Sequence, residues 1–147
     1  MIDRFERFSF AIFEISRHWH KITADVMAEY GLKGPHAIYL IALKKSGGIT
    51  AARLCALCDR DKADVSRAIS LMEKQGLVRR DSKQSYRAQL ELTEAGLAAA
   101  EHVWKKAQAA VDAVGRGIPE EEREKFYIAL ESIAVNLREL STKGIPV

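Results

Sequence analysis

The feature that most constrains the fold is a pair of short helical patterns between residues 49 and 76, separated by only three residues. Thr50 precedes the first pattern, and its hydroxyl can accept a hydrogen bond from a free N–H group of the first turn. Asp59-Arg60-Asp61 then interrupts the apolar spacing. Asp61 can cap the second helix, with Asp64 three residues later in the position of a capping box. The sequence therefore predicts two helices joined by a sharp turn.

The second helix has one apolar face and is followed by an expected β-hairpin. Its apolar residues recur at helical spacing: Val65, Ala68, Ile69 and Met72. Gly76 is expected to end it, because glycine enters the left-handed region at little cost. One strand begins over Leu77–Arg80, and a second, Arg87–Leu92, alternates apolar and polar side chains. Ile49 could add a short third strand, so the pattern predicts a mainly α fold with a small β-hairpin.

The same stretch carries the basic charge of the chain. Residues 44–90 hold 11 Lys or Arg and five Asp or Glu, a net charge of +6. The net charge of residues 1–43 is zero and that of residues 91–147 is −3, so the net charge of the whole chain is only +3. A concentrated positive charge is typical of a surface that binds phosphate groups. The alternative is a helical protein-interaction module whose basic patch binds an acidic protein.

Four motifs, taken in order and spacing, resemble the MarR (multiple antibiotic resistance regulator) family of winged helix-turn-helix proteins. They are Thr50 with Leu54, Asp61-Lys62-Ala63-Asp64-Val65-Ser66-Arg67, Leu77-Val78-Arg79-Arg80 and Leu92-Thr93-Glu94-Ala95-Gly96. The resemblance implies a single MarR-type domain over residues 1–147, mainly α with a β-hairpin wing. Its expected parts are dimerisation helices at 1–31 and 118–147, a winged helix-turn-helix at 35–93 and a connecting helix at 94–115.

The resemblance also implies a function. By this resemblance the protein is expected to be a sequence-specific DNA-binding transcription regulator. It would act as a homodimeric repressor on a pseudo-palindromic double-stranded operator, and a small-molecule effector would release or modulate it. We expect a cytoplasmic protein, because the chain lacks a signal-like N-terminus and an apolar run of about 20 residues. The sequence shows no Gly-rich phosphate loop and no hydrolase or metalloprotease motif, so neither an enzyme nor a cofactor is predicted.

The long helical patterns lie on either side of the basic centre. From Asp3 to Tyr30 apolar residues recur at alternating steps of three and four: Phe5, Phe8, Ile12, Ile15, Trp19, Ile22 and Val26. So long a helix has little of its own domain to bury against, which suggests a partner chain. Thr93 is expected to cap a helix to about Val114, with its own stripe at Leu97, Ala100, Trp104, Ala107, Val111 and Val114. Pro119 starts the last helix.

The candidate DNA-binding residues lie on the second short helix and on the wing. If its apolar face is buried, the helix presents Lys62, Ala63, Ser66, Arg67 and Ser70 outward, where a major groove could be read. The alternative is an ordinary solvated helix face. Where the family wing usually carries Asp-x-Arg, this chain has Gln84-Ser85-Tyr86, and the wing is about two residues short.

Three wing residues remain candidates for DNA contact. Lys83 and Arg87 could reach a minor groove or phosphates. Arg87 could equally pair with a nearby acid, and Tyr86 could pack on a sugar or cover the hairpin.

Two further groups of residues have open interpretations. Cys55 and Cys58 form a C-x-x-C that could be a redox or metal sensor, but both occupy places where a helix would bury small apolar residues. Packing is the favoured reading, and no metal site is predicted. The family resemblance implies an effector crevice between the dimerisation helices and the DNA-binding lobe, with candidate residues Arg17, His18, Lys21, His36 and Tyr39. The alternative places Trp19 and Trp104 in the core and the histidines on the surface.

Overall fold

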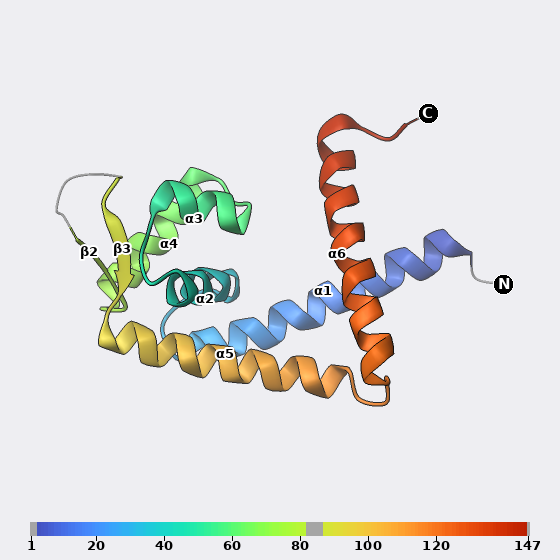
Figure 1. The fold of residues 1–147 in the computed structure, drawn as a ribbon, viewed down its shortest axis with the longest axis horizontal. Coiled ribbons are helices and arrows are strands. Elements are labelled where there is room, and N and C mark those ends of the chain that lie inside the picture. Colours follow the sequence, from blue (N-terminus) through green and yellow to red (C-terminus); the bar gives the residue numbers. More distant parts are fainter. Residues whose placement is uncertain (1–2, 82–86, 147) are drawn as a thin grey trace. The chain divides into compact units, whose positions relative to one another are not determined.

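The computed structural model describes residues 3–81 and 87–146 and divides into two units, one ending at Gln108 and one beginning at Ala109. The elements in chain order are α1 (Arg4–Ala28), the 3₁₀ helix η1 (Gly34–His36), α2 (Ala37–Ser46), β1 (Ile49–Thr50), α3 (Ala51–Cys58), α4 (Lys62–Lys74), β2 (Val78–Arg80), β3 (Gln89–Leu92), α5 (Glu94–Val114) and α6 (Glu120–Lys143) (Figure 1). The predicted mainly α fold with a small antiparallel sheet is confirmed.

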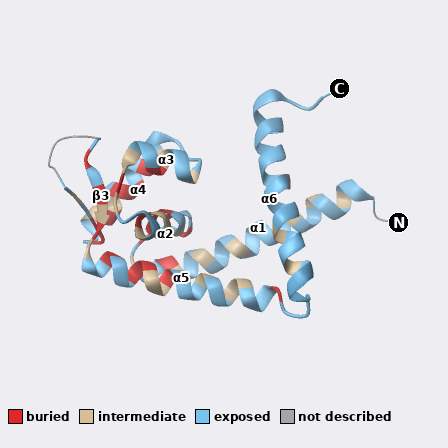
Figure 2. Cartoon of the chain, in the orientation of Figure 1, coloured by how far each residue is buried: buried red, intermediate tan, exposed pale blue. Residues whose placement is uncertain are grey.

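The sheet has three antiparallel strands in the order β1-β3-β2. Val78 pairs with Leu92 across the hairpin, and Ile49 pairs with Leu90, so the short third strand is present. Ala88, Leu90 and Leu92 are buried while Gln89 is exposed, as the alternation predicted. The core of the first unit joins this face of the sheet to α2, α3 and α4 (Figure 2).

The turn between α3 and α4 is closed by backbone hydrogen bonds. Asp59 adopts a left-handed conformation with φ of 51°, and the Arg60 N–H group donates to the Cys55 carbonyl over 3.1 Å. The Asp61 carboxylate then accepts the N–H group of Asp64 at 2.7 Å, as a cap should. The Asp64 carboxylate does not complete the expected capping box, because it turns toward α2 and accepts a hydrogen bond from Tyr39.

The end of α4 is joined to the start of α5. Gly76 has a φ of 74°, and the Leu77 N–H group donates to Met72 at 2.9 Å, which closes α4 as a Schellman motif. The Thr93 hydroxyl donates to the Gly76 carbonyl at 2.6 Å and accepts the Gly96 N–H group at 3.0 Å. Thr93 therefore caps α5 as predicted and holds it against the end of α4.

The buried face of α5 agrees with the predicted stripe at Ala100 and differs from it at Leu97 and Trp104. Leu97 is 50% exposed and Trp104 is 38% exposed, whereas the buried residues are Gly96, Ala99, Ala100 and Val103. Gly96 lets the start of α5 approach the Leu77 carbonyl closely, and the larger Leu97 and Trp104 side chains stay exposed. Trp104 instead lies under the Lys44 ammonium group, 5.4 Å from its ring centroid.

The two long terminal helices expose many apolar side chains within their own units. Met27 is the buried residue of α1, while Phe5 and Phe13 are 76% and 73% exposed. In α6 no described residue is buried. Both helices form as predicted, but most of each apolar stripe stays uncovered within its own unit.

In the part of the chain that the structure describes, no helix has both the length and the apolar character needed to span a bilayer.

We expect Gly96→Ala to destabilise the protein although alanine favours helices by about 1 kcal/mol over glycine. A Cβ atom at this position would lie 1.9 Å from the Leu77 carbonyl oxygen, so the hairpin and α5 must separate. Overpacking of this kind costs about 1–3 kcal/mol or more. The measurement is urea unfolding followed by circular dichroism. Ala98→Gly is the control, since residue 98 is exposed on the same helix and only helix propensity should act there. A gain in stability for Gly96→Ala would contradict the close packing.

Candidate nucleic-acid interface

The two faces of α4 separate apolar from polar side chains. Val65, Ala68, Ile69 and Met72 are buried with at most 1% exposure. All five residues that the sequence assigned to the outward face are exposed: Lys62, Ala63, Ser66, Arg67 and Ser70. The structure thus brings two basic and two hydroxyl side chains together on one accessible helix face, the chemistry that reads base edges and phosphates.

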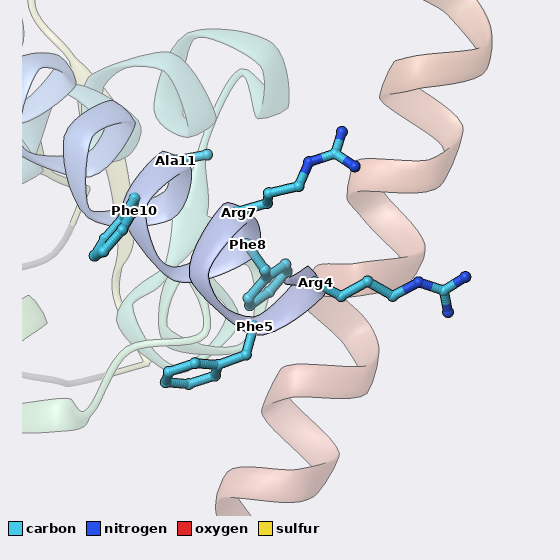
Figure 3. A pocket seen from close by; sticks show the side chains of 6 residues that line it. All are labelled: Arg4, Phe5, Arg7, Phe8, Phe10 and Ala11. Carbon is cyan, nitrogen blue, oxygen red and sulfur yellow. The ribbon is translucent and has the colours of Figure 1, made fainter. Parts of the chain in front are cut away.

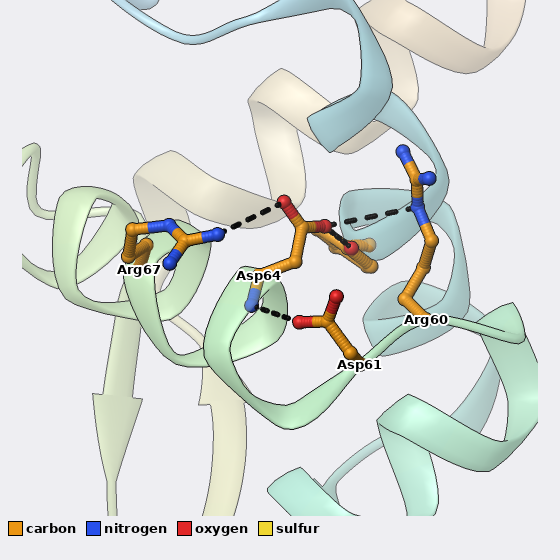
Figure 4. A network of polar contacts seen from close by, with 5 residues as sticks. Arg60, Asp61, Asp64 and Arg67 are labelled. Carbon is orange, nitrogen blue, oxygen red and sulfur yellow. Dashed lines mark hydrogen bonds and ion pairs between the residues drawn. The ribbon is translucent and has the colours of Figure 1, made fainter.

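A polar network at the start of α4 joins this exposed face to the core. The buried Tyr39 hydroxyl donates to the Asp64 Oδ2 atom at 2.5 Å. The same oxygen lies 3.7 Å from Arg60 Nε, and the other carboxylate oxygen lies 4.0 Å from Arg67 Nη2. Figure 4 shows the Asp64 carboxylate between the two arginines, with Asp61 capping the helix beneath it. Sequence analysis missed this network because no local pattern relates residue 39 to residue 64.

The network shifts the pKa of its members. Burial, followed by the hydrogen bond to Asp64, raises the pKa of Tyr39 to about 12. The hydrogen bond from Tyr39 lowers the pKa of Asp64, and the positive charges of Arg60 and Arg67 act in the same direction. Asp64 is therefore ionised and Tyr39 is neutral at physiological pH.

The predicted effector residues fall into two groups. Arg17, His18 and Lys21 are exposed on α1. His36 and Tyr39 are buried, and their rings stack with centroids 6.0 Å apart. The Lys33 N–H group donates to His36 Nδ1, and burial lowers the pKa of His36. These two residues therefore pack the start of α2, and their contact with an effector stays a prediction.

Two arginines of the hairpin are paired with acidic side chains. Arg79 pairs with Glu91 across the strands at 3.3 Å, and Arg80 pairs with Glu73 of α4 at 2.9 Å. Arg87 is exposed at the start of the returning chain. Lys83 and Tyr86 lie outside the described residues, so their assigned contacts stay predictions.

The cysteines lie in the uninterrupted helix α3. Both are free and half-buried, and burial, with a smaller effect from Cys55, raises the pKa of the Cys58 thiol. A raised pKa lowers the fraction of reactive thiolate, which favours the packing interpretation. Over residues 3–81 and 87–146, no group of three or more His, Cys, Asp or Glu side chains is arranged to hold a metal.

Two of the hollows in the described part of the first unit are lined by α1, and neither is an enclosed ligand site. One lies along the first turns of α1, where Phe5 and Phe10 project from one side and Arg4 and Arg7 from another (Figure 3). The second is an apolar crevice of about 20 Å³ lined by Trp19, Met27, Val103 and their neighbours. A volume of that size is too small for an aromatic effector.

Comparison with known proteins supports the architecture. Residues 30–88 match the model of the MarR family. No curated protein matches the chain. A putative MarR family transcriptional regulator from Listeria monocytogenes, solved in complex with a 26mer DNA, is similar with 23% identity, coverage of 100% of this chain and 99% of that one, and a TM-score of 0.79. A MarR transcriptional regulator from Methanosarcina mazei Go1 has 22% identity, coverage of 95% and 94%, and a TM-score of 0.78.

A third solved structure, a MarR family transcriptional regulator from Silicibacter pomeroyi, has 24% identity, coverage of 87% of this chain and 88% of that one, and a TM-score of 0.72. At these identities the solved structures show that the fold is shared along nearly the whole chain.

We expect Tyr39→Phe to lower the free energy of unfolding by about 1 kcal/mol at neutral pH, because it removes one hydrogen bond to a partly exposed carboxylate. The pKa of Asp64 is lowered in the folded state, so its contribution is present above the unfolded pKa of about 3.9 and is lost as the pH falls through the folded value. The difference between wild type and variant should therefore shrink below about pH 4. Urea unfolding at pH 7, 5 and 3.5 measures it. A difference independent of pH would contradict the ionised state of Asp64.

Proposed function

Since residues 30–88 of this chain belong to the MarR family of transcriptional regulators, we propose that the protein binds a specific pseudo-palindromic DNA operator as a homodimer. The observation that carries the proposal is the separation of faces on α4, where Lys62 and Arg67 are exposed on the opposite side from four fully buried residues. A helix fixed in this way presents the same side chains to every DNA site that it meets.

The proposed contacts follow from the position of each residue on α4. The N-terminal half of a recognition helix enters the major groove, where Arg or Lys can bond the O6 and N7 atoms of guanine. Ser66 and Ser70 can bond bases or phosphates, and Ala63 leaves room for the groove wall or a thymine methyl group. The similar Listeria protein was solved with a 26mer DNA, which supports DNA as the partner for this chain.

The wing residues would add contacts that carry little sequence information. We assign Lys83 and Arg87 to contacts with phosphates or a minor groove, and Tyr86 to packing on a sugar. The pairing of Arg79 with Glu91 and of Arg80 with Glu73 leaves these two arginines as parts of the hairpin rather than as first candidates for DNA contact.

A second copy of the chain is the proposed partner of the terminal helices. The apolar stripe of α1 includes Ile15, which is 62% exposed, and α6 exposes Phe126 and Leu137. Covering such surfaces in a dimer would remove them from water. Two recognition helices related by a two-fold axis would then read half-sites about 34–36 Å apart.

The protein would act as a repressor whose affinity for DNA is controlled by an effector. A regulator on an operator that overlaps a promoter represses by occupying it. An effector that binds one arrangement of the two recognition helices more tightly than another would shift the affinity for DNA. The exposed Arg17, His18 and Lys21 of α1 offer cationic and aromatic groups to an anionic effector.

The recognition helix and the wing should respond differently to truncation. Arg67→Ala or Lys62→Ala should cost about 1–3 kcal/mol on the operator and relax preference at one symmetric pair of positions. Lys83→Ala and Arg87→Ala should weaken operator and random duplex alike and make the salt dependence shallower by about one contact per half-site. The measurement is titration against a duplex selected by the wild type and a scrambled duplex at several salt concentrations.

Lys106→Ala is the control for that titration, because Lys106 is an exposed lysine of α5 outside the basic centre. It should leave binding of both duplexes unchanged. Equal losses on both duplexes for the Arg67 and Lys62 variants would show that α4 does not read sequence through them. A wild type without preference between the duplexes would contradict the proposed function and favour an acidic protein partner.

The dimer should be obligate. Ile15→Asp places a charge in the proposed apolar seam, and Ile12→Asp does the same one turn earlier, at a cost of several kcal/mol as an order of magnitude. We expect loss of both the folded dimer and DNA binding, measured by analytical ultracentrifugation and circular dichroism. Glu14→Lys is the matched control, since it changes the charge by two at an exposed polar position of the same helix. A folded Ile15→Asp monomer with full operator affinity would refute the obligate dimer.

A further inference from the structure

The network at the start of α4 links a fully buried side chain to an exposed one through a single carboxylate. Tyr39 has no exposed surface, and its hydroxyl holds one oxygen of Asp64. The other oxygen of Asp64 faces Arg67, whose side chain is 73% exposed (Figure 4). Arg60 lies beside the same carboxylate at 3.7 Å. The exposed arginine is therefore paired with an acid whose position is fixed from the core.

This arrangement suits an arginine that reads a base. The guanidinium group carries five N–H donors, so two can bond guanine while others remain directed at a carboxylate. An exposed arginine otherwise loses rotamer freedom when it is ordered on a base, and prior ordering reduces that cost. An acid near Arg67 also opposes a closer approach by phosphate groups. Both effects favour one base contact over general attraction to DNA.

The anchor of the carboxylate is rigid. The Tyr39 ring stacks on the buried His36 ring, and the Asp64 backbone N–H group is fixed by the Asp61 cap. The hydrogen bond from Tyr39 keeps the pKa of Asp64 low, so the carboxylate is charged when Arg67 lies beside it. Removal of the Tyr39 hydroxyl leaves the aromatic packing in place and frees Asp64 alone.

We propose that Tyr39 and Asp64 are positioning residues that orient Arg67 for bidentate recognition of a guanine, so that discrimination between DNA sequences depends on a hydroxyl buried in α2. This proposal rests on the proposed function. It assigns Tyr39 an indirect role in sequence recognition, because the side chain is fully buried and acts only through Asp64 and Arg67.

The test compares Tyr39→Phe with the wild type on three duplexes. They are a duplex that the wild type selects from a random pool, the same duplex with its symmetric guanines replaced by adenine in turn, and a scrambled duplex. Tyr39→Phe should reduce discrimination about threefold to tenfold at the one symmetric guanine pair read by Arg67, with binding to the scrambled duplex unchanged. Asp64→Asn, which keeps an oxygen acceptor but loses the charge, should reduce it similarly.

Tyr30→Phe is the matched control. The Tyr30 hydroxyl also makes a hydrogen bond within the first unit, with His102 at 2.5 Å, but this partner lies on α5 and not on α4. This variant should lose stability as Tyr39→Phe does and keep its full discrimination. If both tyrosine variants weaken operator and scrambled duplex equally, Tyr39 is merely structural and the proposal is overturned.

A double-mutant cycle separates positioning from an independent effect. In an Arg67→Ala background, Tyr39→Phe should cause no further loss of discrimination, because the residue through which it acts is gone. Additive losses would overturn the proposal. If the wild type selects no sequence, the proposed function fails and this inference fails with it. If the wild type is selective and Tyr39→Phe discriminates equally well, only the positioning role is refuted.

Discussion

The orientation of α4 depends on the burial of its apolar face in the core of the first unit. Val65, Ala68, Ile69 and Met72 together remove a continuous stripe from water. Each of the three larger side chains contributes about 1.5–3 kcal/mol to that preference, and the alanine contributes less. A rotation of the helix about its axis would expose this stripe and bury Lys62 or Arg67. The choice of exposed side chains is thus made by the hydrophobic effect, while the polar network refines the position of one of them.

The helices and strands could be predicted closely because their signals are local. Thr50, Asp61 and Thr93 each precede a helical spacing and each caps the helix that follows. Gly76 ends α4 as expected, since the turn requires a positive φ. The sharp turn at Asp59 was placed correctly, but its left-handed conformation at a residue other than glycine has no distinct local signal.

The features that escaped prediction depend on contacts between distant residues. Helical spacing alone gave α5 a stripe through Leu97 and Trp104, whereas the close approach of Gly96 to Leu77 selects the neighbouring face. Asp64 was expected to complete a capping box. Its carboxylate instead accepts a hydrogen bond from Tyr39, which lies 25 positions earlier in the chain. The apolar stripes of α1 and α6 were visible in the sequence. Such a pattern indicates that the apolar face of a helix is buried, but it does not identify the partner that buries it.

The junction of Gly76, Leu77 and Thr93 has a consequence for the length of the wing. The Thr93 N–H group donates to the Leu77 carbonyl at 2.9 Å, so the chain between these residues is a loop with its ends tied together. The entropy of closing such a loop grows only with the logarithm of its length, and removing two residues from about 17 changes it by about 0.1 kcal/mol. A change of two residues in the length of this hairpin would therefore leave the framework of α4 and α5 almost untouched. The length of the hairpin can vary at little cost in stability, so differences between chains of this fold can accumulate there first.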